Sequence, residues 1–196
     1  MRVSTTAALA AVCLGVASSS PAADLVLEMP GFNSTTKFDT YSGMLHVPGP
    51  VAGYASLDIH YQFHTSQRDA TKDPVVTWHQ GGPGGSSIYG LYGEAGYYQL
   101  SDEGPFVNEH AWNNVANMLY LESPAGSTVG FNPVNALGFS SCTEIGETTP
   151  AHVCSWNDTS QAEAYAATLE AFFIAFPEFA ENDLYLSGES YAGQYL

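Results

Sequence analysis

The strongest constraint on the fold lies at the end of the sequence, where a short apolar run meets a glycine-rich turn. Residues 184–187 have the character of a buried strand and lead into Gly188-Glu-Ser-Tyr-Ala-Gly193. A strand that ends in such a turn before a helix holds a serine, here Ser190, out at the edge of a sheet. Small flanking residues let neighbouring backbone approach. The pattern therefore favours a nucleophile elbow, although the strict form has Gly at the position of Ala192. An ordinary exposed serine in a glycine turn is the alternative.

A second glycine-rich segment, residues 81–85, follows another predicted strand, residues 74–79. An elbow of this kind needs an oxyanion hole made of backbone N–H groups. One group belongs to the residue after the serine, here Tyr191, and another comes from a glycine-rich loop, where Gly81 and Gly82 can supply it. A phosphate-binding loop or a plain turn is the alternative. The sequence lacks both the lysine of a Walker motif and the spacing of a Rossmann motif.

The chain alternates between predicted strands and other elements. We predict strands at residues 41–47, 57–65, 74–79, 117–121 and 184–187. In the second of these, one set of side chains is apolar and the alternating set is polar: Leu57, Ile59, Tyr61 and Phe63 against Asp58, His60, Gln62 and His64. Such alternation predicts a half-buried, antiparallel strand with His60 and His64 on its polar face.

One helix is predicted between the last two strands. Ser160 and Glu163 have the spacing of a capping box, and Pro177 marks the end. The apolar face is expected to consist of Ala162, Tyr165, Ala166, Leu169, Phe172, Phe173 and Phe176. Early antiparallel strands followed by strands alternating with loops or helices predict an α/β sheet covered by helices.

The negative charge and the N-terminal sequence pattern limit the classes of protein to which this chain can belong. The 196 residues carry 20 Asp and Glu against 4 Lys and Arg, which excludes nucleic acid and anionic membrane surfaces as partners. Residues 1–23 have the pattern of a secretory signal peptide, with Arg2 before a short apolar stretch at residues 7–16. Residues 24–196 then have the length of one domain, or of a part of one, and contain no segment long and apolar enough to span a membrane.

Two cysteines and two sequons fit a secretory route. Cys142 and Cys154 are expected to form a disulfide in an oxidising compartment, and pairing with cysteines beyond this chain is the alternative. Asn33 and Asn157 begin Asn-X-Thr/Ser tripeptides and are candidate glycosylation sites. We expect an extracellular or a vacuolar/lysosomal protein.

Four segments together resemble the serine carboxypeptidases of the α/β-hydrolase fold. They are YSGMLHV, WHQGGPGGSS, NMLYLESPAGSTVGF and DLYLSGESYAGQYL, and the resemblance covers residues 38–196. It implies a central mixed, mostly parallel sheet with flanking helices. It also implies that the later strands, helices and any cap of the fold lie outside this chain, so that the chain is the N-terminal part of the domain.

The resemblance also implies roles for single residues. Ser190 corresponds to the nucleophile, and Gly82 and Tyr191 to the donors of the oxyanion hole. The residues that correspond to the site for the substrate's C-terminal carboxylate are Gln80, Gly81, Glu94 and Glu189, with Trp78 beside them. The family's loop usually reads N-G-G-P-G-C-S-S, so Gln80 and Gly85 are departures. No cofactor and no metal is implied.

Glu94 and Glu189 decide the expected pH range. Without the resemblance they are most simply solvated surface groups. Facing a substrate carboxylate, they would create three negative charges in one pocket, and the arrangement works only if protons are shared. We therefore expect the free C-terminus of a peptide or protein to bind most tightly at acid pH.

A serine hydroxyl needs a general base. In this fold the order along the chain is Ser, then Asp or Glu, then His, whereas all 6 histidines precede Ser190. His79 lies beside the glycine-rich loop, where a place in the pocket wall is the less favoured interpretation. We expect a serine-type carboxypeptidase whose Asp and His lie beyond this chain, which is inactive alone. The alternatives are a serine carboxypeptidase-like acyltransferase and a non-catalytic truncated homologue.

Overall fold

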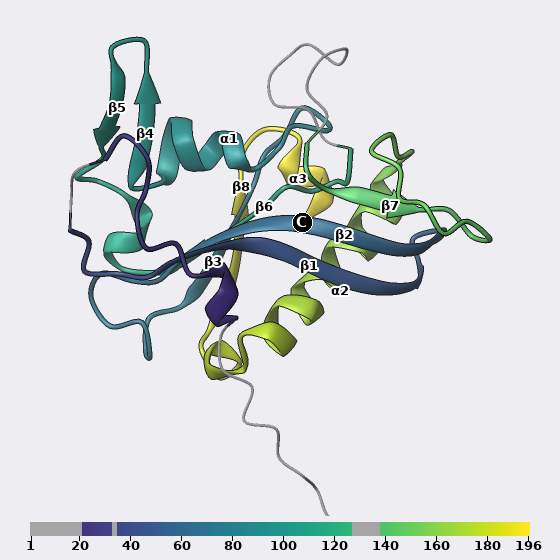
Figure 1. The fold of residues 1–196 in the computed structure, drawn as a ribbon, viewed down its shortest axis with the longest axis horizontal. Coiled ribbons are helices and arrows are strands. Elements are labelled where there is room, and N and C mark those ends of the chain that lie inside the picture. The colour runs from purple at the N-terminus through teal and green to yellow at the C-terminus, as the bar shows by residue number, and fades with distance from the viewer. Residues whose placement is uncertain (1–20, 33–34, 127–137) are drawn as a thin grey trace, which may run out of the picture.

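The computed structural model describes residues 21–32, 35–126 and 138–196. Residues 1–20 of the expected signal peptide and the sequon at Asn33 lie outside this part. At the centre is a six-stranded sheet in the order β1-β2-β6-β3-β8, with β7 also paired to β2 (Figure 1). The bounds of its strands are β1 Thr40–Val51, β2 Tyr54–His64, β3 Val75–His79, β6 Asn117–Leu121, β7 Ser141–Thr143 and β8 Leu184–Gly188.

The sheet is mixed, as expected, with three antiparallel and two parallel strand pairings in the described residues. Strand β2 pairs antiparallel with β1, β6 and β7, whereas β3 is parallel to both β6 and β8. Parallel pairing in the described residues is thus confined to the half of the sheet that ends in the two glycine-rich segments. Because the carboxyl ends of parallel strands lie at the same edge, His79 of β3 comes opposite Gly188 of β8. This register brings the two segments together.

Strand β2 is more buried than its alternation predicts. Leu57, Ile59, Tyr61 and Phe63 are all buried, as expected. The prediction of a polar outer face is wrong for the second half of the strand, because His64 is fully buried as well. Its ring packs against Tyr98 of the β4–β5 hairpin, which the sequence did not predict.

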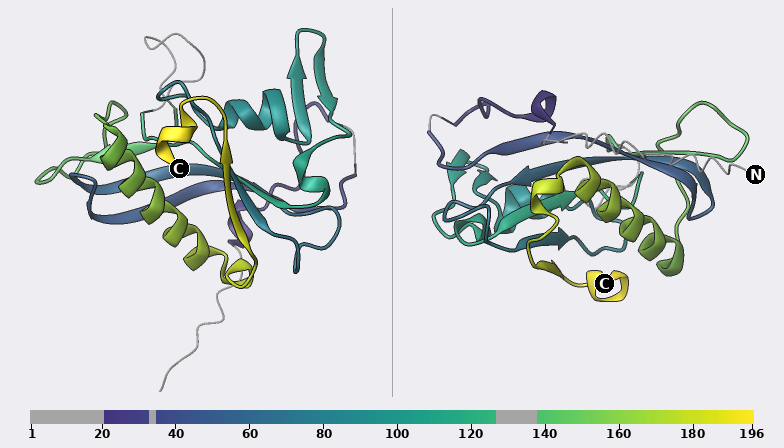
Figure 2. Two further views of the ribbon diagram at one scale, coloured as in Figure 1. Left: turned by 180° about the vertical axis from the view of Figure 1, so that it is seen from behind. Right: turned by 90° about the horizontal axis from the view of Figure 1, so that it is seen from below.

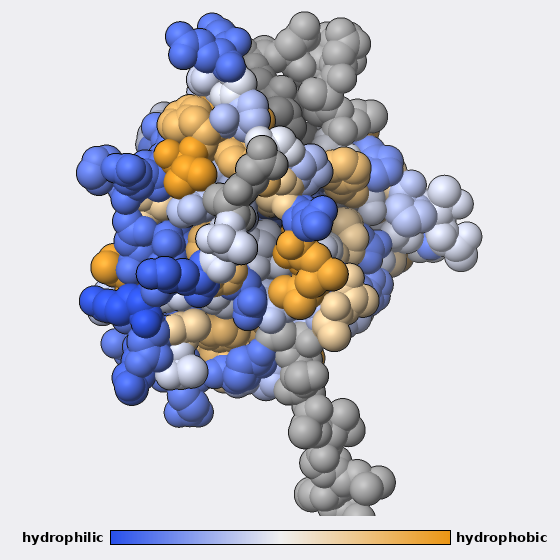
Figure 3. Space-filling view, turned by 60° about the vertical axis from the view of Figure 1, so that its left-hand side comes forward, coloured by the Kyte–Doolittle hydropathy of each residue, from blue (hydrophilic) through white to orange (hydrophobic). Residues whose placement is uncertain are grey.

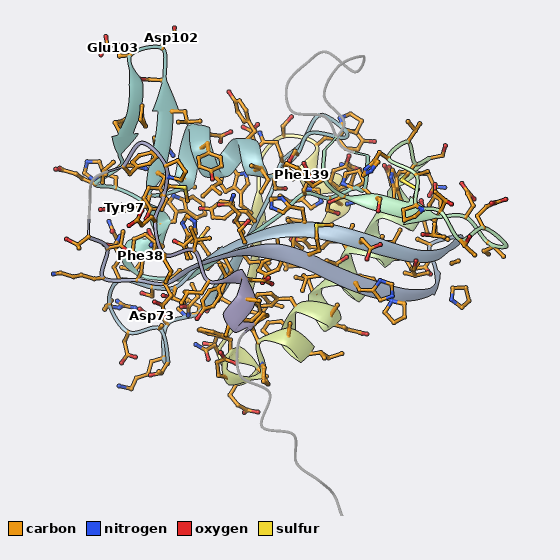
Figure 4. All side chains as sticks on the ribbon, viewed as in Figure 1. Phe38, Asp73, Tyr97, Asp102, Glu103 and Phe139 are labelled. Carbon is orange, nitrogen blue, oxygen red and sulfur yellow. A yellow bond between two sulfur atoms is a disulfide. The ribbon has the colours of Figure 1, made fainter. Side chains whose placement is uncertain are left out.

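The hairpin consists of β4 (Tyr98–Ser101) and β5 (Gly104–Val107), and η2 (Leu91–Ala95) precedes it. Phe38 packs against Tyr97 at its base, with ring centroids 5.0 Å apart, while Asp102 and Glu103 lie at its tip, away from the sheet (Figure 4). The hairpin therefore packs aromatic rings against the sheet at its base, where Tyr98 meets His64, and it carries charge at its exposed end (Figure 4). The remaining short elements are η1 Ala22–Asp24, α1 Ile88–Gly90, η3 Trp112–Asn114, η4 Pro177–Phe179 and α3 Ala192–Tyr195.

The long helix α2 (Asp158–Ala175) lies across one face of the sheet (Figure 2). Its capping box is formed by Asn157 and Ser160, whose side chains each accept a hydrogen bond from the other's backbone N–H at 3.0 Å. The predicted box of Ser160 and Glu163 was therefore wrong by one helical turn. Asn157 is the stronger cap because its side-chain oxygen reaches the N–H three residues on, which the helix itself leaves unpaired.

The buried face of α2 also differs from the prediction. The residues that it buries are Gln161, Ala164, Tyr165, Thr168 and Phe172. Ala162 and Ala166, expected on this face, are exposed. Small alanines do not determine which side of a helix faces the sheet, whereas a large aromatic ring gains more from burial. The ring of Phe172 packs with its centroid 5.0 Å from that of Phe63.

Strand β8 is the last strand of the sheet in the described residues, and it is exposed. The side chains of Leu184, Tyr185 and Leu186 are between 41% and 57% accessible. Val76 of β3, which pairs with Tyr185, lines an open hollow of about 570 Å³ together with Trp112 and Val115, which lie outside the sheet. Apolar side chains are therefore exposed along this edge of the described sheet.

Hydrophilic and hydrophobic residues are mixed on the molecular surface. In the face shown in Figure 3, hydrophobic residues form small separate groups among hydrophilic ones. Among the described residues, no helix has both the length and the apolar character that crossing a membrane requires.

The packing of Phe172 leads to a stability prediction. Phe172→Ala removes a ring with no exposed surface, and we expect it to lower the free energy of unfolding by about 3–5 kcal/mol. The control is Phe173→Ala on the same helix, where the ring is partly exposed and a smaller loss is expected. Urea unfolding followed by circular dichroism measures both. Equal losses would contradict the orientation of α2.

Candidate active site

The turn after β8 has the geometry of an elbow. Ser190 has a positive φ of 56°, which is sparsely populated by residues other than glycine. The backbone N–H of Glu189 donates to the carbonyl oxygen of His79 at 3.2 Å. A Cβ at Gly188 would lie 2.3 Å from that same oxygen and 2.7 Å from Cβ of Ala192. The turn is thus held tightly against the end of β3, which sustains the unfavourable conformation at Ser190.

The glycine-rich loop lies directly beside this turn. A Cβ at Gly81 would be 2.7 Å from the backbone nitrogen of Tyr191 and 2.9 Å from Cβ of Ser190. The N–H of Gly85 donates to the carbonyl oxygen of Gly81 at 2.9 Å and closes the loop. The structure therefore brings the segment containing Gly81 and Gly82 next to Ser190 and Tyr191, where two backbone donors can meet one oxyanion.

A side-chain network joins the residues assigned to carboxylate recognition. Nε1 of Trp78 donates to Oε1 of Gln80 at 3.0 Å. The amide nitrogen of Gln80 then donates to Oε1 of Glu189 at 2.6 Å and to Oε1 of Glu94 at 3.3 Å. Glu94 comes from η2 and Glu189 from the elbow. The two carboxylates are thus held by one amide.

The surroundings of Glu94 raise the pKa of its carboxyl group. Partial burial is the largest cause; the hydrogen bond from Gln80 lowers the pKa by less, and the charge of Glu189 adds the smallest contribution, which raises it. No Lys or Arg occurs from residue 73 to residue 196. Arg68 and Lys72 are engaged by Asp73 and Asp69. A neutral amide, not a cation, therefore holds the two glutamates together.

None of the 6 histidines is hydrogen-bonded to Ser190 in the described part of the chain. Three of them have polar partners: His46 pairs with Asp58, His60 with the hydroxyl of Ser42 and His152 with the carbonyl of Ser140. Two others lie elsewhere, since His64 is buried among aromatic rings and His110 is exposed. Both ring nitrogens of the buried His79 are already engaged, by the carbonyl of Gln80 and the amide of Gln161.

Outside this cluster, Cys142 of β7 is joined by a disulfide to Cys154. The link ties the sheet to the segment that leads into α2. Asn157 is exposed at the start of that helix, so its amide nitrogen is accessible.

Three residues that the sequence interpretation did not single out belong to the site's support. They are Ser123, Gln161 and Tyr195, which contact His79, one another or the glycine-rich loop. Gln161 lies in the first turn of α2 among other polar residues, so no local signal distinguished it; its burial and its partners appear only in the structure.

Comparison with known proteins places this geometry in a family. The family model described as serine carboxypeptidase matches residues 30–196, so the chain belongs to the serine carboxypeptidase family. The sequence is 38% identical to lysosomal protective protein of Mus musculus over 180 residues, which are 91% of this chain and 33% of that protein. It is 37% identical to serine carboxypeptidase ctsa-4.1 of Caenorhabditis elegans, with the same coverage.

A solved carboxypeptidase structure has a similar fold. The prohormone-processing carboxypeptidase Kex1(delta)p of Saccharomyces cerevisiae superimposes with a TM-score of 0.59 and 25% identity, over 81% of this chain and 32% of that one. The expected fold class is thereby confirmed. The chain spans about one third of the length of the relatives it matches.

The close approach at the elbow leads to a second stability prediction. Gly188→Ala places a methyl group against the carbonyl of His79, and we expect a loss of about 1–3 kcal/mol in the free energy of unfolding. Gly193→Ala is the matched control, because its Cβ would meet nothing within 4 Å. In the short helix α3 it should be neutral or slightly stabilising. Urea midpoints compare the two, and a neutral Gly188→Ala would contradict the tight turn.

Proposed function

We propose that the protein containing this chain is a serine-type carboxypeptidase, which releases C-terminal residues from peptides through an acyl-enzyme on Ser190. The observation that carries the proposal is the amide of Gln80 bound to both Glu94 and Glu189, directly beside the elbow. An endopeptidase has no need for paired carboxyl groups at this position. Relatives named serine carboxypeptidases support the same activity.

In this mechanism Ser190 attacks the last peptide carbonyl of the substrate and gives its proton to a general base. Developing charge on the carbonyl oxygen is stabilised by the N–H groups of Gly82 and Tyr191. The peptide C–N bond then breaks, and the C-terminal residue leaves as a free amine with the proton from the base, which leaves the acyl group on Ser190. The general base that activates Ser190 comes from outside the described residues, because none of the histidines within them is hydrogen-bonded to Ser190. Water then releases the acyl group.

The carboxylate of the departing residue lies against Gln80, Gly81 and the two glutamates, with Trp78 orienting the Gln80 amide. A protonated Glu94 donates a hydrogen bond to this carboxylate, whereas an ionised one repels it. The raised pKa of Glu94 therefore suits an acidic compartment. We place the protein in the secretory pathway, extracellular or vacuolar/lysosomal, in line with the relative named lysosomal protective protein and the disulfide.

The nucleophile is tested in the full-length protein. A fluorophosphonate should label Ser190, and blocked dipeptides should be hydrolysed. Ser190→Ala should abolish labelling and lower kcat by at least about 10⁴-fold. Transfer of an acyl group from a glucose ester to an alcohol, without hydrolysis of the dipeptides, would instead identify an acyltransferase. Absence of labelling would identify a non-catalytic homologue.

The role of Glu94 beside Glu189 is tested by the pH dependence of kcat/KM. As pH rises through the raised pKa of Glu94, above its ordinary value of 4.5, the group loses its proton and kcat/KM for a blocked dipeptide should fall. Glu94→Gln keeps a neutral donor, so this fall should disappear. The same peptide with a C-terminal amide has no carboxylate to repel and is the control. An unchanged pH profile in Glu94→Gln would contradict the role of Glu94.

A further inference from the structure

The ring of His79, the last residue of β3, is completely buried beneath the candidate active site. Its Nδ1 lies 2.8 Å from the carbonyl oxygen of Gln80, which can only accept, so Nδ1 carries the proton. Its Nε2 lies 3.1 Å from the amide nitrogen of Gln161, which donates, so Nε2 is the acceptor. The contacts thus define one neutral tautomer of the imidazole.

Neighbouring elements fix the position of this ring. The amide nitrogen of Gln161 also donates to Oγ of Ser123 at 3.0 Å. The ring lies between Tyr165 of α2 and Tyr195 of α3, with centroid distances of 4.8 Å and 4.7 Å. The hydroxyl of Tyr195 accepts a hydrogen bond from the N–H of Gly84, further along the same loop. The ring cannot turn without disturbing the helix, the elbow or the loop.

The acceptor of His79 is the carbonyl of the peptide unit that links Gln80 to Gly81. In a planar trans peptide the C=O and the N–H point in opposite directions. Holding the carbonyl of Gln80 towards the buried ring therefore directs the N–H of Gly81 the other way, away from that ring. The peptide units on either side are held by the bonds from Gln80 N–H to Ser87 and from Gly85 N–H to the carbonyl of Gly81. Because glycine itself restricts the backbone very little, the bond from Nδ1 adds a direct restraint on the plane between them.

We propose that His79 is a positioning residue for substrate recognition: its Nδ1–H fixes the Gln80–Gly81 peptide so that the N–H of Gly81 donates to the substrate's C-terminal carboxylate. The inference rests on the proposed carboxypeptidase function. His79 does not touch the reacting atoms, and its two occupied nitrogens separate this role from that of a base for Ser190.

The arrangement is suited to acid conditions. Burial lowers the pKa of His79, against a smaller raising by the hydrogen bond to Gln80. The groups that face the ring are the side chains of Gln161, Tyr165 and Tyr195 and the carbonyl of Gln80, none of which is an acid ionised at low pH. The neutral tautomer therefore persists where an exposed histidine would be protonated.

Kinetics of the full-length protein test the role of His79. His79→Gln and His79→Leu both remove the donor at the Nδ1 position, whereas His79→Asn keeps an amide N–H there. We expect His79→Gln and His79→Leu to raise KM about tenfold for a blocked dipeptide, the loss of roughly one hydrogen bond to a charged group, with kcat within twofold. His79→Asn should restore KM. The matching C-terminal amide should show no change in KM with any variant.

A second readout is spectroscopic and independent of activity. In protein labelled with ¹⁵N-histidine, the signals lost in His79→Asn should show a protonated Nδ1, an unprotonated Nε2 and no titration at the ordinary histidine pKa. A protonated Nε2 would overturn the inference, as would unchanged KM in both His79→Gln and His79→Leu, or an equal rise in KM for acid and amide. If wild-type protein hydrolyses no peptide, the proposed function fails and this inference with it. An active enzyme with an indifferent His79 refutes the inference alone.

Discussion

The arrangement of the site depends on the parallel pairing of β3 and β8. Because the two strands end at the same edge, the carbonyl of His79 receives the N–H of Glu189, and Gly188 must lack a side chain there. A second close approach, between Gly81 and the backbone of Tyr191, follows from the first. The strained conformation of Ser190 is thus maintained by backbone contacts on both sides, which a flexible loop could not supply.

Charge imposes the next constraint. Two carboxylates meet where the hydrogen-bonding group between them is a neutral amide and not a cation, so this amide relieves their repulsion. Gln80 does this with one amide, whose oxygen is in turn fixed by Trp78. The family's usual Asn is one methylene shorter. The amide nitrogen of the longer Gln80 side chain lies 2.6 Å from Oε1 of Glu189. In this chain the amide therefore already donates hydrogen bonds to both glutamates without a substrate.

The sequence predicted the elements whose signal is local. The five strands expected in the sheet are all present, and the turn at Ser190 and the loop at Gly81 lie together. These features could be predicted because glycines and apolar runs determine the local backbone conformation. The cap and buried face of α2 were predicted less well, since alanines on both sides left the helix orientation open. The burial of His64 could not be predicted, because it depends on Tyr98 in a hairpin far along the chain.

Gln80 connects the part of the site that sequence could predict with the part that it could not. Its side chain belongs to the network of carboxyl groups at the sheet edge, which the glycine-rich motif indicates. Its carbonyl belongs to the buried network of His79 and Gln161. No sequence motif predicts this second network, because Gln161 lies on a helix that is distant in the sequence. One residue therefore couples the position of α2 to the geometry of the carboxylate site. Any shift of Gln161 would move the ring of His79, and through the rigid peptide plane it would turn the N–H of Gly81.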